Sequence, residues 1–193
     1  MTGQYFCMLQ KLALLILKIT GWELVGSVPD LKKAVFIAAP HTSNWDGFWL
    51  LVAKCAFKLE VRFLAKHTLF WWPLGSLLRG FGAMPIDRGV ACSTVDLLTE
   101  KFAREGQFFL ALAPEGTRRW RPYWKSGFYQ IARAAGVPIV FGFIDYNKRR
   151  LGIGATLSEF KGVQQDLQTI RDFYAPFVGR RPENSGPVEF PPT

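Results

Sequence analysis

Four short apolar runs recur along the chain, each rich in branched or aromatic residues and bounded by breakers of regular structure. They cover residues 34–39 (AVFIAA), 61–65 (VRFLA), 108–113 (FFLALA) and 138–144 (PIVFGFI). Short runs that are apolar throughout are typical of strands that are buried on both faces of a sheet. The pattern therefore predicts four core strands.

Segments with helical spacing lie between these strands. We expect helices over residues 44–57, 92–104 and 126–134, and a solvated turn over DYNKRR, residues 145–150. AGVPIV, residues 135–140, has the pattern of a helix end followed by a strand start. Alternating strands and helices favour a single-domain α/β sandwich with a central, largely parallel mixed sheet flanked by helices. In such sheets, ligands bind beyond the carboxyl ends of the strands.

The N-terminal segment is apolar but short. Residues 5–19, YFCMLQKLALLILKI, would form a helix of about 22 Å, whereas the hydrocarbon core of a bilayer is roughly 30 Å thick. Neither a basic segment before the run nor a small-residue cleavage site after it is present, so a signal peptide is not expected. Gln4, Lys11 and Lys18 share one stripe and leave a broad apolar face. We expect residues 1–22 to form an amphipathic membrane-docking helix, with burial in the protein core as the alternative.

The C-terminal segment has a different composition. Residues 179–193 contain four prolines and little apolar periodicity. We expect a loosely packed tail there.

Charge and composition narrow the class of partner. The chain has 24 basic and 15 acidic residues, a formal charge of +9, which favours nucleic acid, an anionic membrane or a phosphorylated substrate. Seven tryptophans favour a lipid–water boundary, and the chain has no recognised nucleic-acid-binding motif. The chain has an odd number of cysteines in apolar surroundings, namely Cys7, Cys55 and Cys92. This pattern predicts neither a disulfide framework nor a zinc site, and it fits a reducing cytoplasm.

The segment APHTSNWDG, residues 39–47, contains one of the two histidines of the chain. His41 and Asp46 would lie about 140° apart on a straight helix, so one of them must lie outside it. Thr42 or Ser43 can cap the following helix, which places Asp46 in the first turn and His41 on the preceding loop. Asp46 could then accept the Nδ1 proton of His41 and leave Nε2 free as a general base. Ser43 and Asp46 also have the spacing of a capping box, in which the aspartate would be structural.

Two further segments carry charged residues at places where a ligand could bind. GAMPIDRG, residues 82–89, has Asp87 and Arg88 in a glycine-bounded loop, where a surface ion pair is the alternative. APEGTRRW, residues 113–120, directly follows a predicted strand. There a glycine can adopt positive φ and an arginine can bind phosphate through paired hydrogen bonds. An ordinary turn with solvated arginines is the alternative.

Taken in this order, HTSNWD, PIDR, PEGTR and GVPIV resemble the four sequence blocks of the glycerolipid acyltransferases, the lysophosphatidic acid acyltransferase family with its histidine-four-residues-aspartate motif. The similarity extends from about residue 34 to residue 145. It implies that His41 is the general base and that Asp46 orients it. Expected substrate-binding residues are Arg88, Glu115, Gly116, Thr117 and Arg118, of which the two arginines and the glutamate would hold the phosphate and glycerol of the acceptor.

The resemblance implies an O-acyltransferase of phospholipid biosynthesis. The donor would be acyl-CoA or acyl-carrier protein, and the acceptor a lysophospholipid, most simply 1-acylglycerol 3-phosphate. A lyso-ornithine lipid or lyso-cardiolipin is the alternative acceptor, and a basic membrane-binding module without chemistry is the alternative function. We expect neither a metal nor a cofactor, an acyltransferase domain over residues 23–178, and peripheral attachment to the cytoplasmic face of the cell membrane.

The chain departs from this family in two respects. Many relatives have a longer or doubled N-terminal hydrophobic segment, and many carry a further basic residue where GVACS follows Arg88 here. The aromatic stretch FWWPL, residues 70–74, could line an acyl channel or insert at a membrane, but we expect buried packing. His67 has no acidic neighbour in the sequence, and we expect it to be a surface or satisfied histidine.

Overall fold

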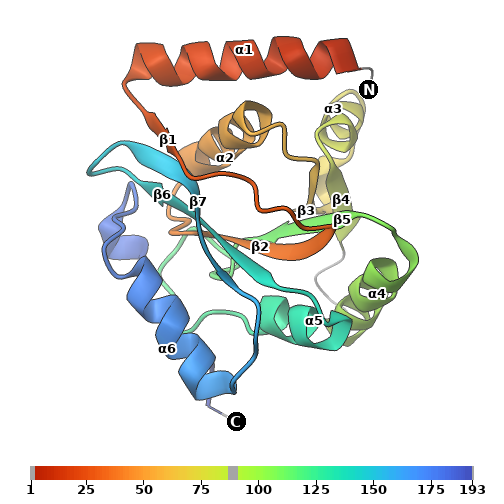
Figure 1. Cartoon of the computed structure of the whole chain (residues 1–193), viewed down its shortest axis with the longest axis vertical. Helices are drawn as coiled ribbons and strands as arrows, with labels where there is room; N and C mark the ends of the chain where they lie inside the picture. Colours follow the sequence, from red (N-terminus) through yellow and green to blue (C-terminus); the bar gives the residue numbers. More distant parts are fainter. Residues whose placement is uncertain (1–2, 87–90, 193) are drawn as a thin grey trace.

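The computed structural model describes residues 3–86 and 91–192, and within them it contains one seven-stranded sheet (Figure 1). The strands are β1 (Glu23–Val25), β2 (Lys33–Ala39), β3 (Val61–Lys66), β4 (Ala83–Ile86), β5 (Phe108–Leu112), β6 (Ile139–Asp145) and β7 (Arg150–Leu157). Their order in the sheet is β1-β7-β6-β2-β5-β3-β4. Neighbouring strands of this described sheet are parallel except β6 and β7, which are antiparallel. The predicted α/β fold with a largely parallel mixed sheet is confirmed.

Helices cover both faces of the sheet (Figure 1). The helices are α1 (Gly3–Thr20), α2 (Asn44–Ala56), α3 (Leu74–Gly80), α4 (Ala91–Arg104), α5 (Gly127–Ala135) and α6 (Val163–Tyr174), with short 3-10 turns η1 (His67–Leu69) and η2 (Pro182–Asn184). α1 packs against α2 on one face, and α4, α5 and α6 lie on the other. The predicted helices therefore form, whereas α3 and α6 were not expected.

The central strand β2 explains why the apolar runs are uninterrupted. Val35 and Ile37 point into the core beneath α5 and α6, whereas Ala34 and Phe36 point into the core on the opposite face. All four side chains are at most 5% exposed. Because a strand between two helical layers has no solvent face, an alternating pattern would leave polar groups buried without partners.

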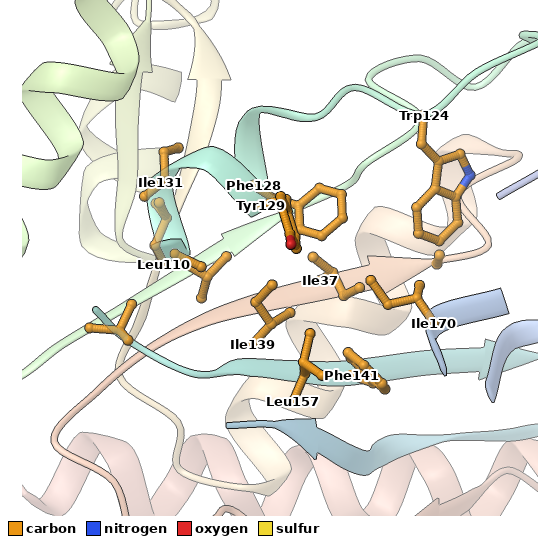
Figure 2. Packing of buried hydrophobic residues seen from close by; sticks show 14 of the residues in the cluster. Ile37, Leu110, Trp124, Phe128, Tyr129, Ile131, Ile139, Phe141, Leu157 and Ile170 are labelled. Atoms are coloured by element: carbon orange, nitrogen blue, oxygen red, sulfur yellow. The ribbon is translucent and has the colours of Figure 1, made fainter. Parts of the chain in front are cut away.

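The larger core lies between the sheet and α5 and α6 (Figure 2). Figure 2 shows branched side chains of the central strands facing aromatic and branched side chains of these two helices; they include Ile37, Leu110, Ile139, Phe141, Phe128 and Ile170. α5 ends at Ala135 and is capped by Gly136, whose φ of 62° is left-handed, and β6 begins three residues after this glycine. The predicted helix end and strand start at AGVPIV are confirmed, because glycine adopts this conformation without a steric penalty.

The C-terminal segment packs differently from the loosely packed tail that we expected. Val188 and Phe190 contact the larger core, and the backbone N–H of Trp124 donates to the Glu189 carbonyl over 2.7 Å. Gly186 lies so close to the Arg121 carbonyl that an added Cβ would come within 1.9 Å of its oxygen. The prolines therefore belong to a docked, irregular segment, which we call the C-terminal strap (residues 178–190).

The aromatic stretch at residues 70–74 is also less buried than expected. Trp71 is 59% exposed and Trp72 is 84% exposed, so the expectation of buried packing is wrong for both tryptophans. Within the described residues, no helix combines the length and the apolar character that crossing a membrane requires.

Candidate active site

The loop between β2 and α2 carries His41, as predicted. β2 ends at Ala39, so the loop lies beyond the carboxyl end of a central strand. Ser43 is the N-cap of α2, with an extended backbone, and its Oγ accepts a hydrogen bond from Trp45 N over 3.2 Å. The Asp46 carboxylate accepts from Ser43 N over 2.7 Å, which completes a capping box. The structural interpretation of Asp46 is thus confirmed, and it does not exclude a second role.

The imidazole of His41 turns back over this first helical turn. Its Nδ1 atom is buried and lies 3.5 Å from Asp46 Oδ2, while the His41 side chain as a whole is 19% exposed. This separation is longer than a good N–H···O hydrogen bond, which spans about 2.7–3.2 Å. Catalytic hydrogen bonds are often long without substrate and shorten when it binds. The pair therefore has the relative position that an aspartate needs to orient an imidazole.

The carboxylate of Asp46 is fully buried and is held from several sides. Oδ2 accepts from Thr42 N (2.6 Å) and Ser43 N (2.7 Å), and Oδ1 accepts from Ser43 Oγ (2.9 Å) and Tyr146 Oη (2.6 Å). Burial alone would raise its pKa, but the contacts with His41, Tyr146 and Ser43 outweigh this effect and lower the pKa to about 2. Asp46 is consequently a fixed anion beneath the imidazole throughout the neutral range.

Glu115 lies behind the same loop. It is 6% exposed, and its Oε2 accepts a hydrogen bond from the backbone N–H of His41 over 2.7 Å. Burial raises the pKa of Glu115 to about 8; the His41 hydrogen bond opposes the shift and the negative charge of Asp46 adds to it. At neutral pH this carboxyl is therefore mostly protonated. In the structure, Glu115 therefore helps to fix the position of the His41 backbone.

The other residues of the PEGTR segment form a turn after β5. Gly116 has a φ of 66°, and a Cβ there would come within 2.7 Å of the Lys125 side chain. Thr117 Oγ1 accepts from Arg119 N over 3.4 Å, and Arg118 is exposed. The predicted site residue Arg88 lies outside the described residues.

Tyr146 is a site residue that the sequence did not single out. It lies in the DYNKRR turn between β6 and β7, which was expected to be solvated, yet its Oη donates to Asp46 over 2.6 Å. Its ring packs edge-on against Trp22, with 5.1 Å between ring centroids. Because Tyr146 and Asp46 are a hundred residues apart, no local spacing could have indicated this contact.

The C-terminal strap completes the surroundings of the loop. Arg181 N donates to Thr42 Oγ1 over 3.2 Å, and Asn184 Nδ2 donates to the Thr42 carbonyl over 3.4 Å. The Arg180 guanidinium carbon lies 5.5 Å from the centroid of the Trp45 ring. The loop that carries His41 is therefore held by residues from the far end of the chain.

Two pockets are lined by residues of the central strands. One, of about 190 Å³, is lined by Pro40, Glu115 and Tyr174 and is covered by residues of the strap. A larger one, of about 390 Å³, is lined by Val61 and Phe108, at the amino ends of their strands and so at the edge of the sheet away from His41. The smaller pocket adjoins the loop, so we relate only that one to the site. In the part of the chain that the structure describes, no three His, Cys, Asp or Glu side chains lie together as metal ligands would.

Comparisons with known proteins show the fold and the family of the chain. No curated protein sequence gives a match to the chain. Among solved structures, the 1-acyl-sn-glycerophosphate (LPA) acyltransferase PlsC from Thermotoga maritima is similar, with a TM-score of 0.59 at 18% identity, over 87% of this chain and 76% of that one. This likeness shows a shared fold. A model of the acyltransferase family matches residues 17–141, more than half of the chain and a stretch that includes the His41 loop and Glu115. The chain therefore belongs to the acyltransferase family.

Proposed function

We propose that this acyltransferase transfers a fatty acyl group from a thioester donor, acyl-CoA or acyl-carrier protein, to the free hydroxyl of a lysophospholipid. The acceptor that we favour is 1-acylglycerol 3-phosphate. The observation that carries the proposal is the contact between His41 Nδ1 and the buried carboxylate of Asp46. The similarity of fold to an LPA acyltransferase supports the choice of acceptor.

In the proposed mechanism, neutral His41 acts as the general base. Asp46 holds the proton on Nδ1, so Nε2 can accept the proton of the acceptor hydroxyl as its oxygen attacks the thioester carbonyl. The tetrahedral intermediate then collapses with cleavage of the C–S bond, and the imidazolium returns the proton to the departing thiolate. The products are an ester and a free thiol. The fixed charge of Asp46 stabilises the imidazolium that forms between the two steps.

The surrounding residues have distinct roles in this proposal. Glu115 holds the backbone of His41 through its hydrogen bond, and this fixes the start of the loop. Arg118 and Arg88 bind the phosphate of the acceptor, since a guanidinium can donate two parallel hydrogen bonds to a phosphate. No cofactor takes part.

The same proposal includes peripheral attachment to an anionic membrane at its cytoplasmic face. The inner side of α1 is buried, with Ala13 and Leu17 each 3% exposed. Its outer side carries four exposed apolar residues at helical spacing, which we call the outer stripe (Met8, Leu12, Leu15 and Ile19). A helix that packs on protein with one side and exposes an apolar stripe on the other is suited to lie at a lipid–water boundary. The exposed Trp71 and Trp72 support the same interpretation.

The test uses the two histidines of the chain as a matched pair. His41→Ala should lower turnover with acyl-CoA and 1-acylglycerol 3-phosphate at least about a hundredfold, because the general base is lost. His67→Ala removes an exposed histidine of η1 and should leave turnover unchanged. The measurement is product formation by mass spectrometry, with far-ultraviolet circular dichroism to show that both variants fold.

The acceptor is tested in the same assay. A panel of 1-acylglycerol 3-phosphate, lyso-ornithine lipid and lyso-cardiolipin separates the favoured acceptor from the two alternatives. Equal turnover by wild type and His41→Ala would refute the catalytic assignment. A strong preference for another acceptor would refute the headgroup assignment alone.

A further inference from the structure

Arg180 is a residue of the C-terminal strap whose backbone is fixed against the His41 loop. On one side, Gly179 packs so closely on Thr42 that an added Cβ would come within 2.7 Å of Thr42 Oγ1. On the other side, Arg181 N donates a hydrogen bond to the same oxygen over 3.2 Å. Thr42 directly follows His41. The backbone of Arg180 therefore has a defined position beside the proposed general base.

The side chain of Arg180 is held by the first turn of α2. Its guanidinium carbon lies 5.5 Å from the centroid of Trp45, the residue that precedes Asp46 in the sequence, and Trp45 is 53% exposed. A cation–π contact of this kind does not require the guanidinium N–H groups to donate to another protein group, so they can donate to a ligand. Among the described residues, no carboxylate lies within ion-pair distance of this guanidinium.

The charge of Arg180 also acts on the site. Burial raises the pKa of Tyr146, and the hydrogen bond to Asp46 raises it further, whereas the positive charge of Arg180 opposes the shift. Tyr146 donates to Asp46, which contacts His41. The guanidinium is thus close enough to exert a field on the hydrogen-bonded group beneath the imidazole.

We propose that Arg180 is a substrate-binding residue that holds a phosphate group of a substrate beside the His41–Asp46 pair. The proposal rests on the proposed function and adds to it a residue outside the four sequence blocks. A guanidinium that lies over an aromatic ring and has no carboxylate within ion-pair distance among the described residues is suited to bidentate binding of phosphate, and both the acceptor and the phosphopantetheine of either donor carry one. The N-terminus of α2 adds a positive field at the same place.

The first experiment compares Arg180→Ala with Arg181→Ala, which removes an equal charge from the next residue. The side chain of Arg181 is exposed. We expect Arg180→Ala to raise the KM of one substrate about tenfold or more with little change in kcat. Arg181→Ala should change the same KM less than about twofold, because only Arg180→Ala removes a hydrogen bond to a charged group. Arg180→Lys should recover part of the loss, because lysine keeps the charge but not the paired donors. Equal KM values for the two alanine variants would overturn the proposal.

A second variant tests whether Trp45 positions the side chain of Arg180. Trp45→Leu removes the ring over which the guanidinium lies. It should raise the same KM, and the double variant with Arg180→Ala should be no worse than Arg180→Ala alone, because both act through one contact. Additive effects would show that Trp45 does not position Arg180. A general loss of kcat and of thermal stability in Arg180→Ala would indicate a structural role instead.

Phosphate-free analogues identify which substrate supplies the phosphate. With monoacylglycerol as acceptor, the difference between wild type and Arg180→Ala should vanish if the acceptor phosphate is bound. With an acyl-N-acetylcysteamine donor, it should vanish if the donor phosphate is bound. A difference that persists with both analogues would contradict phosphate binding.

Equilibrium dialysis separates this proposal from the proposed function. Binding of 1-acylglycerol 3-phosphate and of CoA is measured without turnover on wild type, Arg180→Ala and Arg181→Ala. Suppose that the wild-type protein transfers no acyl group, and that Arg180→Ala lowers the affinity for a ligand about tenfold whereas Arg181→Ala does not. The proposed function is then wrong and the phosphate site stands. If wild type is active and neither ligand distinguishes the two variants, the phosphate site is wrong and the function stands.

Discussion

At the scale of single residues, two buried carboxyl groups flank the His41 loop and have opposite ionisation. The pKa of Asp46 is about 2, below the ordinary value of 3.8, because its hydrogen bonds outweigh burial. Its ionised form therefore stabilises the fold by about 2 kcal/mol above pH 4, a contribution lost as the pH falls from about 4 to about 2. The pKa of Glu115 is raised to about 8 by burial. One group thus supplies the negative charge of the site, and the other is a neutral acceptor for a backbone N–H.

Glu115 gives the first pH-dependent prediction. The unfolded chain releases this proton near pH 4.5, whereas the folded chain holds it up to about pH 8, so stability should fall as the pH rises between these values. The slope from a single proton is about 1.4 kcal/mol per pH unit. Glu115→Gln removes the titration, so the variant should be more stable than wild type at pH 7.5 and closer to it at pH 4.5. Urea unfolding at the two pH values measures this, with Glu183→Gln, an exposed glutamate, as the control.

The same variant tests what Glu115 does in turnover. Glutamine retains an oxygen that can accept from His41 N, so Glu115→Gln should keep turnover within about threefold, while Glu115→Ala should lose more because a buried backbone donor is left without a partner. A loss as large in the glutamine variant as in the alanine variant would show that the enzyme needs a charged carboxylate there.

The His41–Asp46 contact was predictable because it depends on local rules. A strand end, a serine cap and a first helical turn bring two residues five positions apart together, and each has a sequence signal. Tyr146 and Arg180 reach the same place from other parts of the fold. Their partners are remote in sequence, so only the sheet order and the course of the strap bring them near.

At the scale of elements, the predicted strands form where a run is apolar on both faces. The predicted helices form where one face is apolar throughout. α3 was missed because LGSLLRG is short, contains two glycines and borders an aromatic stretch. α6 was missed because VQQDLQTIRDFY is mostly polar, and its few buried residues show their role only against the sheet. The strap was misjudged since prolines and polar residues indicate irregular backbone, which can still dock through backbone hydrogen bonds.

Because the strap is docked on the protein, we expect two glycine substitutions to differ in how much stability they cost. Gly186→Ala would place a methyl group within 1.9 Å of the Arg121 carbonyl oxygen, so it should destabilise the protein by about 1–3 kcal/mol. Gly106→Ala has nothing within 4 Å and should be close to neutral. Chemical denaturation of both variants measures the difference, and turnover should fall in Gly186→Ala alone because the strap holds Thr42. If both variants were equally stable and equally active, the C-terminal segment would be a loosely packed tail.

At the scale of the whole molecule, α1 lies on the opposite side of the sheet from α4, α5 and α6 (Figure 1). Several of its apolar side chains are exposed. Under the proposed membrane attachment, the net charge of +9 would draw the protein towards anionic lipid, and the outer stripe would supply the apolar contact that charge alone lacks. In that attachment, the two together would orient the molecule with α1 towards lipid.

Polar substitution of the outer stripe tests this orientation. Replacing Met8, Leu12, Leu15 and Ile19 by serine should reduce binding to phosphatidylglycerol vesicles about a hundredfold or more, because four apolar side chains no longer enter the interface. The fold should survive, since these side chains are exposed. Leu97→Ser, at a 65% exposed position of α4 on the opposite face, should bind vesicles like wild type. Co-sedimentation with vesicles measures both, and undiminished binding by the quadruple variant would remove α1 from the interface.

The strap also has a consequence for biosynthesis. Thr42 leaves the ribosome early, but its partner Arg181 follows 139 positions later. A chain that ends at residue 178 and has been released from the ribosome should therefore have its sheet yet lack a finished His41 loop, and acyl transfer should require the strap. Acyl-transfer assays on released chains that end at graded positions would show this as a step between residues 178 and 190, and activity in the shorter chains would contradict it.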